Sequence, residues 1–147
     1  MFRPFEAQDL DACIEIYLET FASPPWNESW DPVVVRARLD QIVRTPGFFG
    51  AILGAGEPEG FALGFSEPWH EGSHFYLKEM CVRPTLQRRG HGSALMEYLT
   101  SQLVSRDIRR IYLLTARGDL SQAFYSKAGF YISPKMILMA RRLEGRI

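Results

Sequence analysis

The sequence predicts a single domain of mixed helix and sheet, of the α/β or α+β class. The chain has 147 residues, enough to bury one ordinary hydrophobic core, and hydrophobic residues make up 46% of it. Segments with apolar residues at helical spacing alternate with short apolar runs bounded by glycine, proline and polar residues. Because helix and strand patterns interleave, without repeat, linker or low-complexity segment, one mixed layer architecture accounts for them.

The beginning of the chain is expected to form one strand and then two helices. Residues 1–5 are the strand candidate, and the proline-rich residues 23–30 separate the helices. Asp9 is placed to cap the first helix, and Asp31 with Pro32 to begin the second, because a short acceptor side chain and a proline suit a helix start. The apolar positions at helical spacing are Leu10, Cys13, Ile14, Tyr17, Leu18 and Phe21, then Val35, Leu39, Ile42 and Val43.

The rest of the chain is expected to form further strands with two helices among them. The expected strands are residues 48–53, 60–65, 75–82, 109–115, 130–133 and 135–142. One helix follows a glycine turn, and the other covers residues 119–128, where Asp119 and Gln122 make an Asx version of a capping box. The complete order is β-α-α-β-β-β-α-β-α-β-β.

The glycine turn lies between the apolar run at residues 75–82 and the helix pattern after it. Residues 87–93 read Gln-Arg-Arg-Gly-His-Gly-Ser. The free backbone N–H groups of a first helical turn and the helix dipole favour an anion there, and glycines let a phosphate approach the backbone closely. The turn has neither Walker A nor Rossmann spacing, so the pattern that remains is Gln-x-x-Gly-x-Gly.

A second motif follows in the expected order. Residues 124–130 read Phe-Tyr-Ser-Lys-Ala-Gly-Phe, with Gly129 ending a helix. Together the two segments resemble the signatures of the GNAT superfamily of acyl-CoA-dependent N-acetyltransferases. The resemblance implies a twisted mixed sheet with helices on both faces, and it is close only from about residue 75 onward.

The resemblance also implies a coenzyme A site. The glycine turn would hold the pyrophosphate, and the backbone at the end of the preceding strand would lie alongside the pantetheine. The expected cofactor-binding residues are Cys81, Val82, Gln87, Arg88, Arg89, Gly90, His91, Gly92, Ser93 and Tyr125. No metal is expected, because the histidines and cysteines have no metal-ligand spacing.

Acetyl transfer to an amine needs a proton acceptor. An alkyl ammonium has a pKa of about 10, so only about one molecule in a thousand is neutral at pH 7, a penalty of about 4 kcal/mol. Glu79 is the expected base, on the strand that borders the acyl group in the family. The apolar residues around it do not alternate strictly, which suggests a β-bulge near Lys78 and Glu79 that aims the carboxylate into the cleft. Alternatively, Glu79 pairs with Lys78 or a neighbouring arginine, and His70 or His74 is the base.

Tyr125 is the expected acid, because it matches the family tyrosine that lies near the CoA sulfur. A thiol is a fair leaving group, so a weak acid suffices. The alternative is an aromatic side chain that only packs. Cys81 could form a thioester by nucleophilic catalysis, but an inert strand cysteine is the expected role.

The amine acceptor is expected between the link of the first two helices and the loop before the central strand. Aromatic faces and carboxylates there suit a cationic amine, although both could also serve packing and solvation. The expected substrate-binding residues are Trp26, Glu28, Trp30, Trp69 and His70, with Asn27, Glu67 and Glu71 close to them in sequence. The family asparagine after the fifth strand is missing, and Arg117, Asp119 or Ser121 is a candidate replacement.

Bulk properties narrow the partners. The chain has 17 basic and 17 acidic residues and a formal net charge of zero, which gives no general attraction to nucleic acid. Neither a signal-peptide core nor a membrane-length apolar run is present, and two cysteines make no disulfide framework, so we expect a cytoplasmic protein. The expected partner is a small-molecule or peptide amine, and a homodimer is left open.

The leading interpretation is an N-acetyltransferase that moves acetyl from acetyl-CoA to a primary amine in a ternary complex. The alternative is a catalytically silent acyl-CoA-binding or sensory module. Nucleic-acid binding is the third reading, which the neutral charge disfavours.

Overall fold

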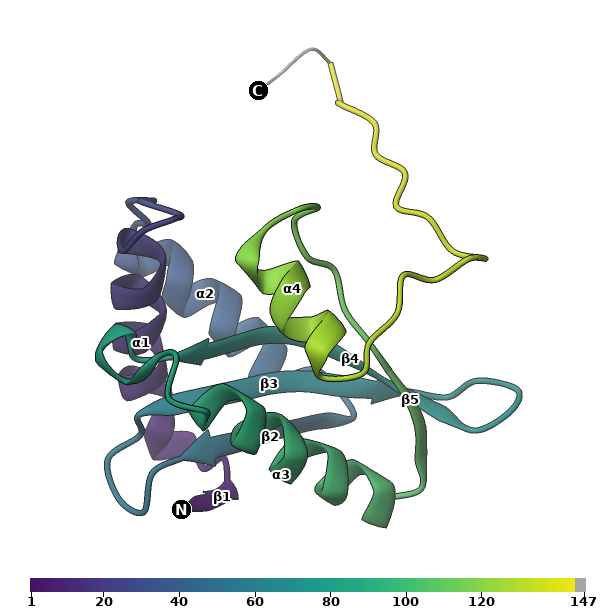
Figure 1. Cartoon of the computed structure of the whole chain (residues 1–147), viewed down its shortest axis with the longest axis horizontal. Helices are drawn as coiled ribbons and strands as arrows, with labels where there is room; N and C mark the ends of the chain where they lie inside the picture. Colours follow the sequence, from purple (N-terminus) through teal and green to yellow (C-terminus); the bar gives the residue numbers. More distant parts are fainter. Residues whose placement is uncertain (145–147) are drawn as a thin grey trace. The chain divides into compact units, whose positions relative to one another are not determined.

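The structure is a computed structural model that describes residues 1–144 (Figure 1). The chain divides into two compact units, one from Met1 to Leu114 and one that begins at Thr115. The first unit contains the sheet and three α-helices. The second contains the helix α4 (Leu120–Lys127).

A five-stranded sheet forms the centre of the first unit, with its strands in sequence order. The strands are β1 (Phe2–Pro4), β2 (Phe48–Leu53), β3 (Gly60–Glu67), β4 (Ser73–Val82) and β5 (Ile108–Tyr112). Neighbouring strands are antiparallel except β4 and β5, which are parallel. The connection from β4 to β5 is therefore a crossover, and it contains the helix α3 (His91–Ser105).

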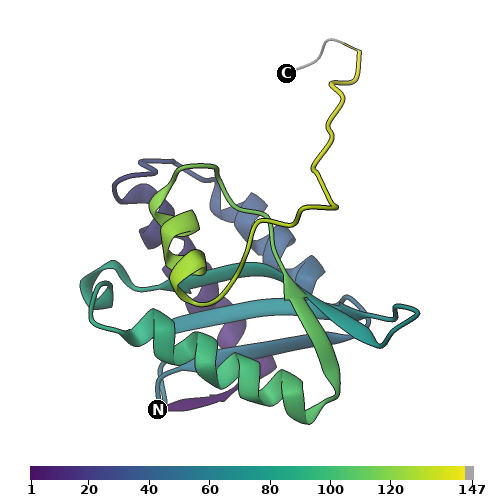
Figure 2. The same ribbon diagram turned by 45° about the vertical axis from the view of Figure 1, so that its right-hand side comes forward.

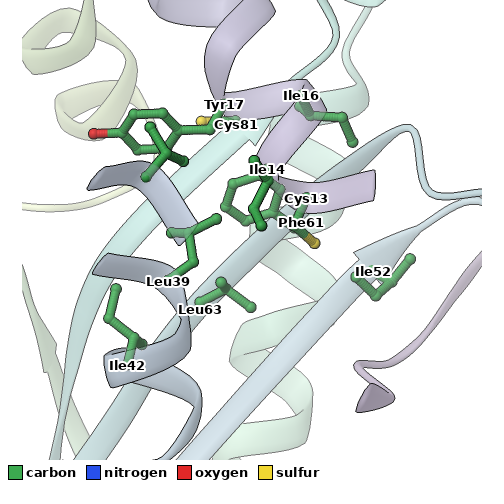
Figure 3. Close-up of a cluster of buried hydrophobic side chains, with 11 residues drawn as sticks. Cys13, Ile14, Ile16, Tyr17, Leu39, Ile42, Ile52, Phe61, Leu63 and Cys81 are labelled. Atoms are coloured by element: carbon green, nitrogen blue, oxygen red, sulfur yellow. The ribbon is translucent and has the colours of Figure 1, made fainter. Parts of the chain in front are cut away.

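Helices cover both faces of this sheet, as the resemblance implied (Figures 1 and 2). On one face α1 (Leu10–Ala22) and α2 (Pro32–Val43) bury the predicted apolar stripes. On the other, α3 buries Leu95, Leu99 and Leu103. Figure 3 shows the first of these cores, in which Tyr17 and Leu39 from the helices pack over Leu63 and Cys81 of the strands. Packing against helices on both faces fixes the register of the strands, because a one-residue slip would move every core side chain to the opposite face of the sheet.

Helix starts agree with the sequence at Asp31 but not at Asp9. The Asp31 carboxylate accepts a 2.9 Å hydrogen bond from the N–H of Val33, the expected cap. Asp9 makes no such bond to α1. Its carboxylate accepts instead from the N–H of Glu6, at the start of the short 3₁₀ turn η1 (Ala7–Asp9), and from both terminal nitrogens of Arg3, all at 2.8 Å. The bidentate arginine explains the difference, because it is a stronger partner than a single amide.

The Arg3–Asp9 pair gives a stability prediction. The Asp9 side chain is only 4% exposed, so Arg3→Met leaves a buried carboxylate without its counter-charge and should cost about 3 kcal/mol of unfolding free energy at pH 7. The Arg3 hydrogen bonds lower the pKa of Asp9, so this contribution is present above the unfolded-state pKa and disappears as pH falls through the folded-state value. Thermal unfolding should therefore show a difference in stability between the parent protein and Arg3→Met that is large at neutral pH and becomes smaller at acid pH. A gap of constant size would contradict the electrostatic account.

A bulge in β4 confirms the irregularity expected at Lys78 and Glu79. In the ladder with β3, Glu79 lies opposite Leu63 and Leu77 lies opposite Gly64, so Lys78 has no opposite residue. The backbones approach so closely there that a Cβ on Gly64 would lie 2.2 Å from the carbonyl oxygen of Tyr76. Only glycine fits this position without displacement of the bulge.

The last two expected strands, at residues 130–133 and 135–142, do not form. The described chain after α4 contains neither helix nor strand, and apolar side chains such as Met139, 82% exposed, are not buried. A strand exists only through hydrogen bonds to a neighbouring strand, and no described residue forms such a ladder with this segment. The preceding strand is also shorter than expected, because β5 ends at Tyr112.

Candidate active site

The two parallel strands of the sheet separate at their C-terminal ends. β4 and β5 are paired from Ser73 to Tyr76, where Tyr76 lies opposite Tyr112. β5 then ends, while β4 continues through the bulge to Val82. Among the described residues no strand pairs with this edge of β4 between Leu77 and Val82. Backbone groups on an unpaired edge are available to an extended ligand.

The glycine turn follows this edge directly. After the 3₁₀ turn η2 (Pro84–Leu86), Arg88 has φ +65° and Gly90 has φ +83°, and Gly90 is the N-cap of α3. Left-handed residues at this point turn successive N–H groups to one side, which makes an anion-binding concavity. A Cβ on Gly90 would meet no atom within 4 Å, so space is open in front of the turn. The backbone of the turn is therefore open to an approaching anion.

Side chains around the turn have different roles. Arg88, Arg89 and Ser93 are exposed, where they can contact a phosphate. The Gln87 amide instead donates a 2.9 Å hydrogen bond to the carbonyl oxygen of Val82, which ties the turn back to the strand. His91 and Gly92 begin α3, where the first N–H groups have no partner within the helix.

Glu79 lies at the bulge and points toward the face covered by α1 and α2. Its side chain is 10% exposed, and it accepts a 2.5 Å hydrogen bond from Nε of Arg38 on α2. Burial raises the pKa of Glu79, while the positive charges of Arg38 and Lys78 oppose that rise. The bulge is therefore present at Glu79, and its carboxylate lies in an ion pair with an arginine, which was the alternative to the role of base.

Tyrosine side chains lie near this ion pair and at the point where β4 and β5 separate. Tyr17, in α1, is 2% exposed, and burial together with the negative charge of Glu79 raises its pKa. At the point where the strands separate, the rings of Tyr76 and Tyr112 stack with centroids 4.5 Å apart. The Tyr112 hydroxyl donates a 2.8 Å hydrogen bond to Glu67, and the Lys78 ammonium lies 4.7 Å from the Tyr76 ring centroid. A cation is already accommodated by this aromatic face.

The sequence does not predict Arg38, Tyr76 or Tyr112 as site residues. Arg38 lies between the apolar positions of α2, where a charged residue is expected to be an ordinary part of the solvent-exposed helix surface. Tyr76 and Tyr112 read as strand residues in two separate runs. The strand-turn-helix-strand order implies that the two strands are parallel neighbours, and this pairing is the signal from which the proximity of Tyr76 and Tyr112 could have been predicted.

The expected acceptor residues form two groups. In the link between α1 and α2, Trp30 donates a 2.9 Å hydrogen bond to Glu28 and packs edge-on against Tyr17, with centroids 5.2 Å apart. Trp26 packs against Phe21 in the same cluster. This group therefore reaches the Glu79 region through Tyr17.

The second group lies in the loop between β3 and β4. Trp69 is 45% exposed and stacks on His74 with centroids 4.6 Å apart. His70 is exposed beside it. This group surrounds the beginning of β4, whereas Glu79 lies beyond the bulge.

Cys81 is the expected cofactor contact whose side chain is withdrawn from the edge. Its thiol is buried between the sheet and α1, and burial followed by the charge of Glu79 raises its pKa well above the usual range. A thiol held protonated is a poor nucleophile. Only the backbone of Cys81 is offered to a ligand on the unpaired edge.

In the second unit Tyr125 belongs to an aromatic group on α4. Its ring contacts Phe124 and Phe130 edge-on, with centroids 5.2 and 5.6 Å away. Asp119, a candidate replacement for the missing asparagine, accepts a hydrogen bond from the N–H of Leu120 and so caps the helix. Gln122 accepts from the N–H of Gly118, one residue earlier than a capping box requires.

Two negative findings apply to residues 1–144. No group of three or more His, Cys, Asp or Glu side chains could hold a metal ion. None of the helices in this range has the length and apolar character that a membrane crossing needs.

Comparison with known proteins shows the family. The model of the Acetyltransferase (GNAT) family matches residues 10–130. The chain therefore belongs to the GNAT acetyltransferases. No curated protein matches the chain.

Solved structures agree in fold. A structure described as a possible acetyltransferase from Clostridium difficile 630 has a TM-score of 0.80 at 13% identity, with 97% of each chain covered. The aminoglycoside N-acetyltransferase AAC(6')-Iy, in complex with CoA, has a TM-score of 0.72 at 16% identity, with 97% of this chain and 94% of that chain covered. The aminoglycoside acetyltransferase meta-AAC0020 from an uncultured soil metagenomic sample, in complex with sisomicin, has a TM-score of 0.73 at 13% identity, covering 98% and 96%.

Proposed function

We propose that the protein is an N-acetyltransferase that moves acetyl from acetyl-CoA to a primary amine by direct transfer in a ternary complex. The observation that carries this proposal is the unpaired edge of β4, which leads straight into an open left-handed glycine turn at the start of α3. An edge for an extended amide chain followed by an anion cradle suits a ligand with a pantetheine arm and a pyrophosphate. We propose one catalytic domain over residues 1–147.

The CoA contacts follow from the geometry of the turn. The N–H groups from Arg88 to Ser93 would bind the pyrophosphate, with the Arg88 and Arg89 guanidinium groups adding charge-assisted contacts. The backbone of Cys81 and Val82 would pair with the pantetheine. Gln87 acts indirectly, because its bond to Val82 fixes the angle between strand and turn.

Glu79 is proposed as the base that takes a proton from the acceptor ammonium. The neutral amine then attacks the thioester carbonyl, the C–N bond forms and the C–S bond breaks. The thiolate takes a proton from Tyr125. The second amine proton, released as the amide is completed, passes through solvent water to restore the Tyr125 hydroxyl, and the proton held by Glu79 goes to solvent when the products leave. The buried, protonated thiol of Cys81 supports direct transfer rather than a thioester on the protein.

The acceptor is proposed to be a small-molecule or peptide amine. Aminoglycosides, the substrates named for two structural neighbours, are amines of this kind. The proposed contacts are the Trp26, Glu28 and Trp30 group, which reaches the Glu79 region, and the Trp69 and His70 group of the β3–β4 loop. Cys13 and Cys81 are free and buried, which accords with the cytoplasm as compartment.

The proposed acid can be tested by removing one oxygen. Tyr125→Phe keeps the ring contacts with Phe124 and Phe130, so α4 should remain folded. If the hydroxyl protonates the leaving thiolate, the single-turnover rate should fall roughly ten- to a hundredfold while acetyl-CoA affinity changes little.

The melting temperature of the same Tyr125→Phe preparation is the control. A lower melting temperature with a normal rate per folded molecule would show that Tyr125 only packs. A full-rate variant of normal stability would remove the acid role as well.

The experiment that tests the function is a screen of an amine panel with acetyl-CoA as donor. Release of free CoA thiol is followed optically, and the mass of each amine is measured afterwards. The proposal predicts CoA release together with acetylation of at least one panel member. CoA release without an acetylated amine would contradict it.

A silent acyl-CoA-binding module is the second candidate, and the Arg38–Glu79 ion pair is the observation that favours it. A carboxylate neutralised by arginine could be purely structural. Tight CoA binding with no turnover on a broad amine panel would support this candidate over the enzyme.

A further inference from the structure

The ion pair of Arg38 with Glu79 differs from the ion pair that Arg36, on the same helix α2, makes with Asp11. Arg36 pairs with Asp11 at 2.6 Å, but the two side chains are 56% and 79% exposed, where solvent screens the interaction. Glu79 is 10% exposed, so its carboxylate has lost most of its hydration and depends on the groups around it. Two arginines of one helix therefore act in different dielectric surroundings.

The position of Arg38 is fixed by the packing of its helix. Val35, Leu39 and Ile42 on α2 are at most 4% exposed, and they fix the rotation of the helix against the sheet. That rotation places Arg38 at the edge of the helix face, with its side chain 40% exposed and Nε on the Glu79 carboxylate. The guanidinium can thus reach Glu79 without being buried itself.

Few other groups compete for Glu79. Tyr17 faces it from α1, and Lys78, Tyr76 and Cys81 flank it on its own strand. From β3 the opposite residue is Leu63, which is apolar. Tyr17, Tyr76 and Cys81 are neutral near pH 7, since burial raises the pKa of each. Within residues 1–144, the positive charges that act on Glu79 come from Arg38 and Lys78.

We infer that Arg38 is a positioning residue for Glu79, one that holds the buried carboxylate in a single orientation and keeps it ionised at neutral pH. This inference rests on the proposed role of Glu79 as base. A general base can accept a proton only while it is unprotonated. Burial among apolar side chains favours the protonated form of a carboxyl group. The charge of Arg38 opposes the effect of burial on the carboxylate, while its own side chain stays partly exposed.

The consequence is a defined change in the pH profile. Arg38→Met removes the main opposing charge, so the pKa of Glu79 should rise by about one unit, and the acidic limb of kcat/KM should move up by the same amount. On that limb the variant should be about tenfold slower than the parent protein, with the difference vanishing at alkaline pH. Arg38→Lys keeps the charge and should restore most of the profile.

The experiment combines two readouts. The first is the pH dependence of kcat/KM for the best amine of the panel. The second is a ¹³C NMR titration of glutamate-labelled protein, in which Glu79→Gln identifies the Glu79 carboxyl signal without any turnover. Arg36→Met is the matched control, because it removes an arginine from the same helix without touching Glu79. Arg38→Gln replaces Arg38→Met if the latter does not fold.

The expected result is that Arg38→Met, or Arg38→Gln, raises both the titration midpoint of Glu79 and the acidic limb, while Arg36→Met raises neither. Unchanged midpoints in the Arg38 variants, or an equal change in Arg36→Met, would overturn the inference. Failure of the proposed function is recognised separately, by a full-rate Glu79→Gln protein. In that case Arg38 could still move the NMR midpoint, but no acidic limb would follow it.

Discussion

Glu79→Gln should slow acetyl transfer about 10²-fold near neutral pH, the usual effect of losing a general base. Glutamine keeps the shape of the side chain, and its carbonyl oxygen can still accept from Arg38, so the contact between α2 and β4 should persist. Only the ability to take up a proton is lost. The rate difference should therefore shrink as pH approaches the pKa of the amine itself, because the neutral amine then needs no base. Single-turnover rates measured across this pH range check the prediction.

Two control variants separate Glu79 from the other candidate bases. His70→Asn and Glu28→Gln change proposed acceptor contacts, so each should raise KM for the amine but leave the single-turnover rate at saturating amine and neutral pH within a few-fold of the parent protein. If Glu79→Gln shows no loss, or a loss that does not depend on pH, the base is an ordered water, His70 or Glu28.

Gly92→Glu should lower CoA affinity by more than tenfold, which is a loss of more than about 1.4 kcal/mol. Gly92 lies in the first turn of α3, where the N–H groups face the proposed pyrophosphate site. The substitution adds bulk and a negative charge at a place where the ligand is itself an anion. An acidic side chain in a first helical turn is favourable to the helix, so the fold should stay intact. Calorimetric titration with CoA measures the change.

Gly92→Gln is the matched control for charge, because it adds the same bulk without the carboxylate. Gly92→Gln should lose less CoA affinity than Gly92→Glu. The difference in affinity between the two variants should become smaller at high salt, which screens exposed charges. Unchanged affinity in Gly92→Glu would remove the phosphate assignment from this turn.

Local signals in the sequence were sufficient for the helices and for the first four strands, all of which lie before residue 83 or in continuous helical patterns. The apolar stripes of α1 and α2, the Asp31 cap and the bulge at Lys78 depend on residues close in sequence, and the structure confirms each. The family resemblance is confirmed by the match of the GNAT family model to residues 10–130. It was readable from the sequence because both motifs are short continuous segments.

Features that depend on distant partners could not be read in this way. Arg38 and Glu79 are 41 residues apart, and nothing local tells which arginine meets a strand carboxylate. Asp9 had a suitable type and place for a cap, yet Arg3 offered it a stronger partner. The apolar residues 136–139 resemble a strand, but a strand also needs a hydrogen-bonded neighbour, which their own sequence cannot supply.

The most direct test of the central claim follows the acetyl group itself. Acetyl-CoA labelled with ¹³C in the acetyl carbonyl is incubated with the protein and the best amine of the panel, and both products are quantified by mass spectrometry. The account predicts that the label appears as an amide on the amine, in the same amount as free CoA, and that Glu79→Gln slows both together. Labelled acetate in place of labelled amide, or no release of CoA while acetyl-CoA still binds, would contradict it.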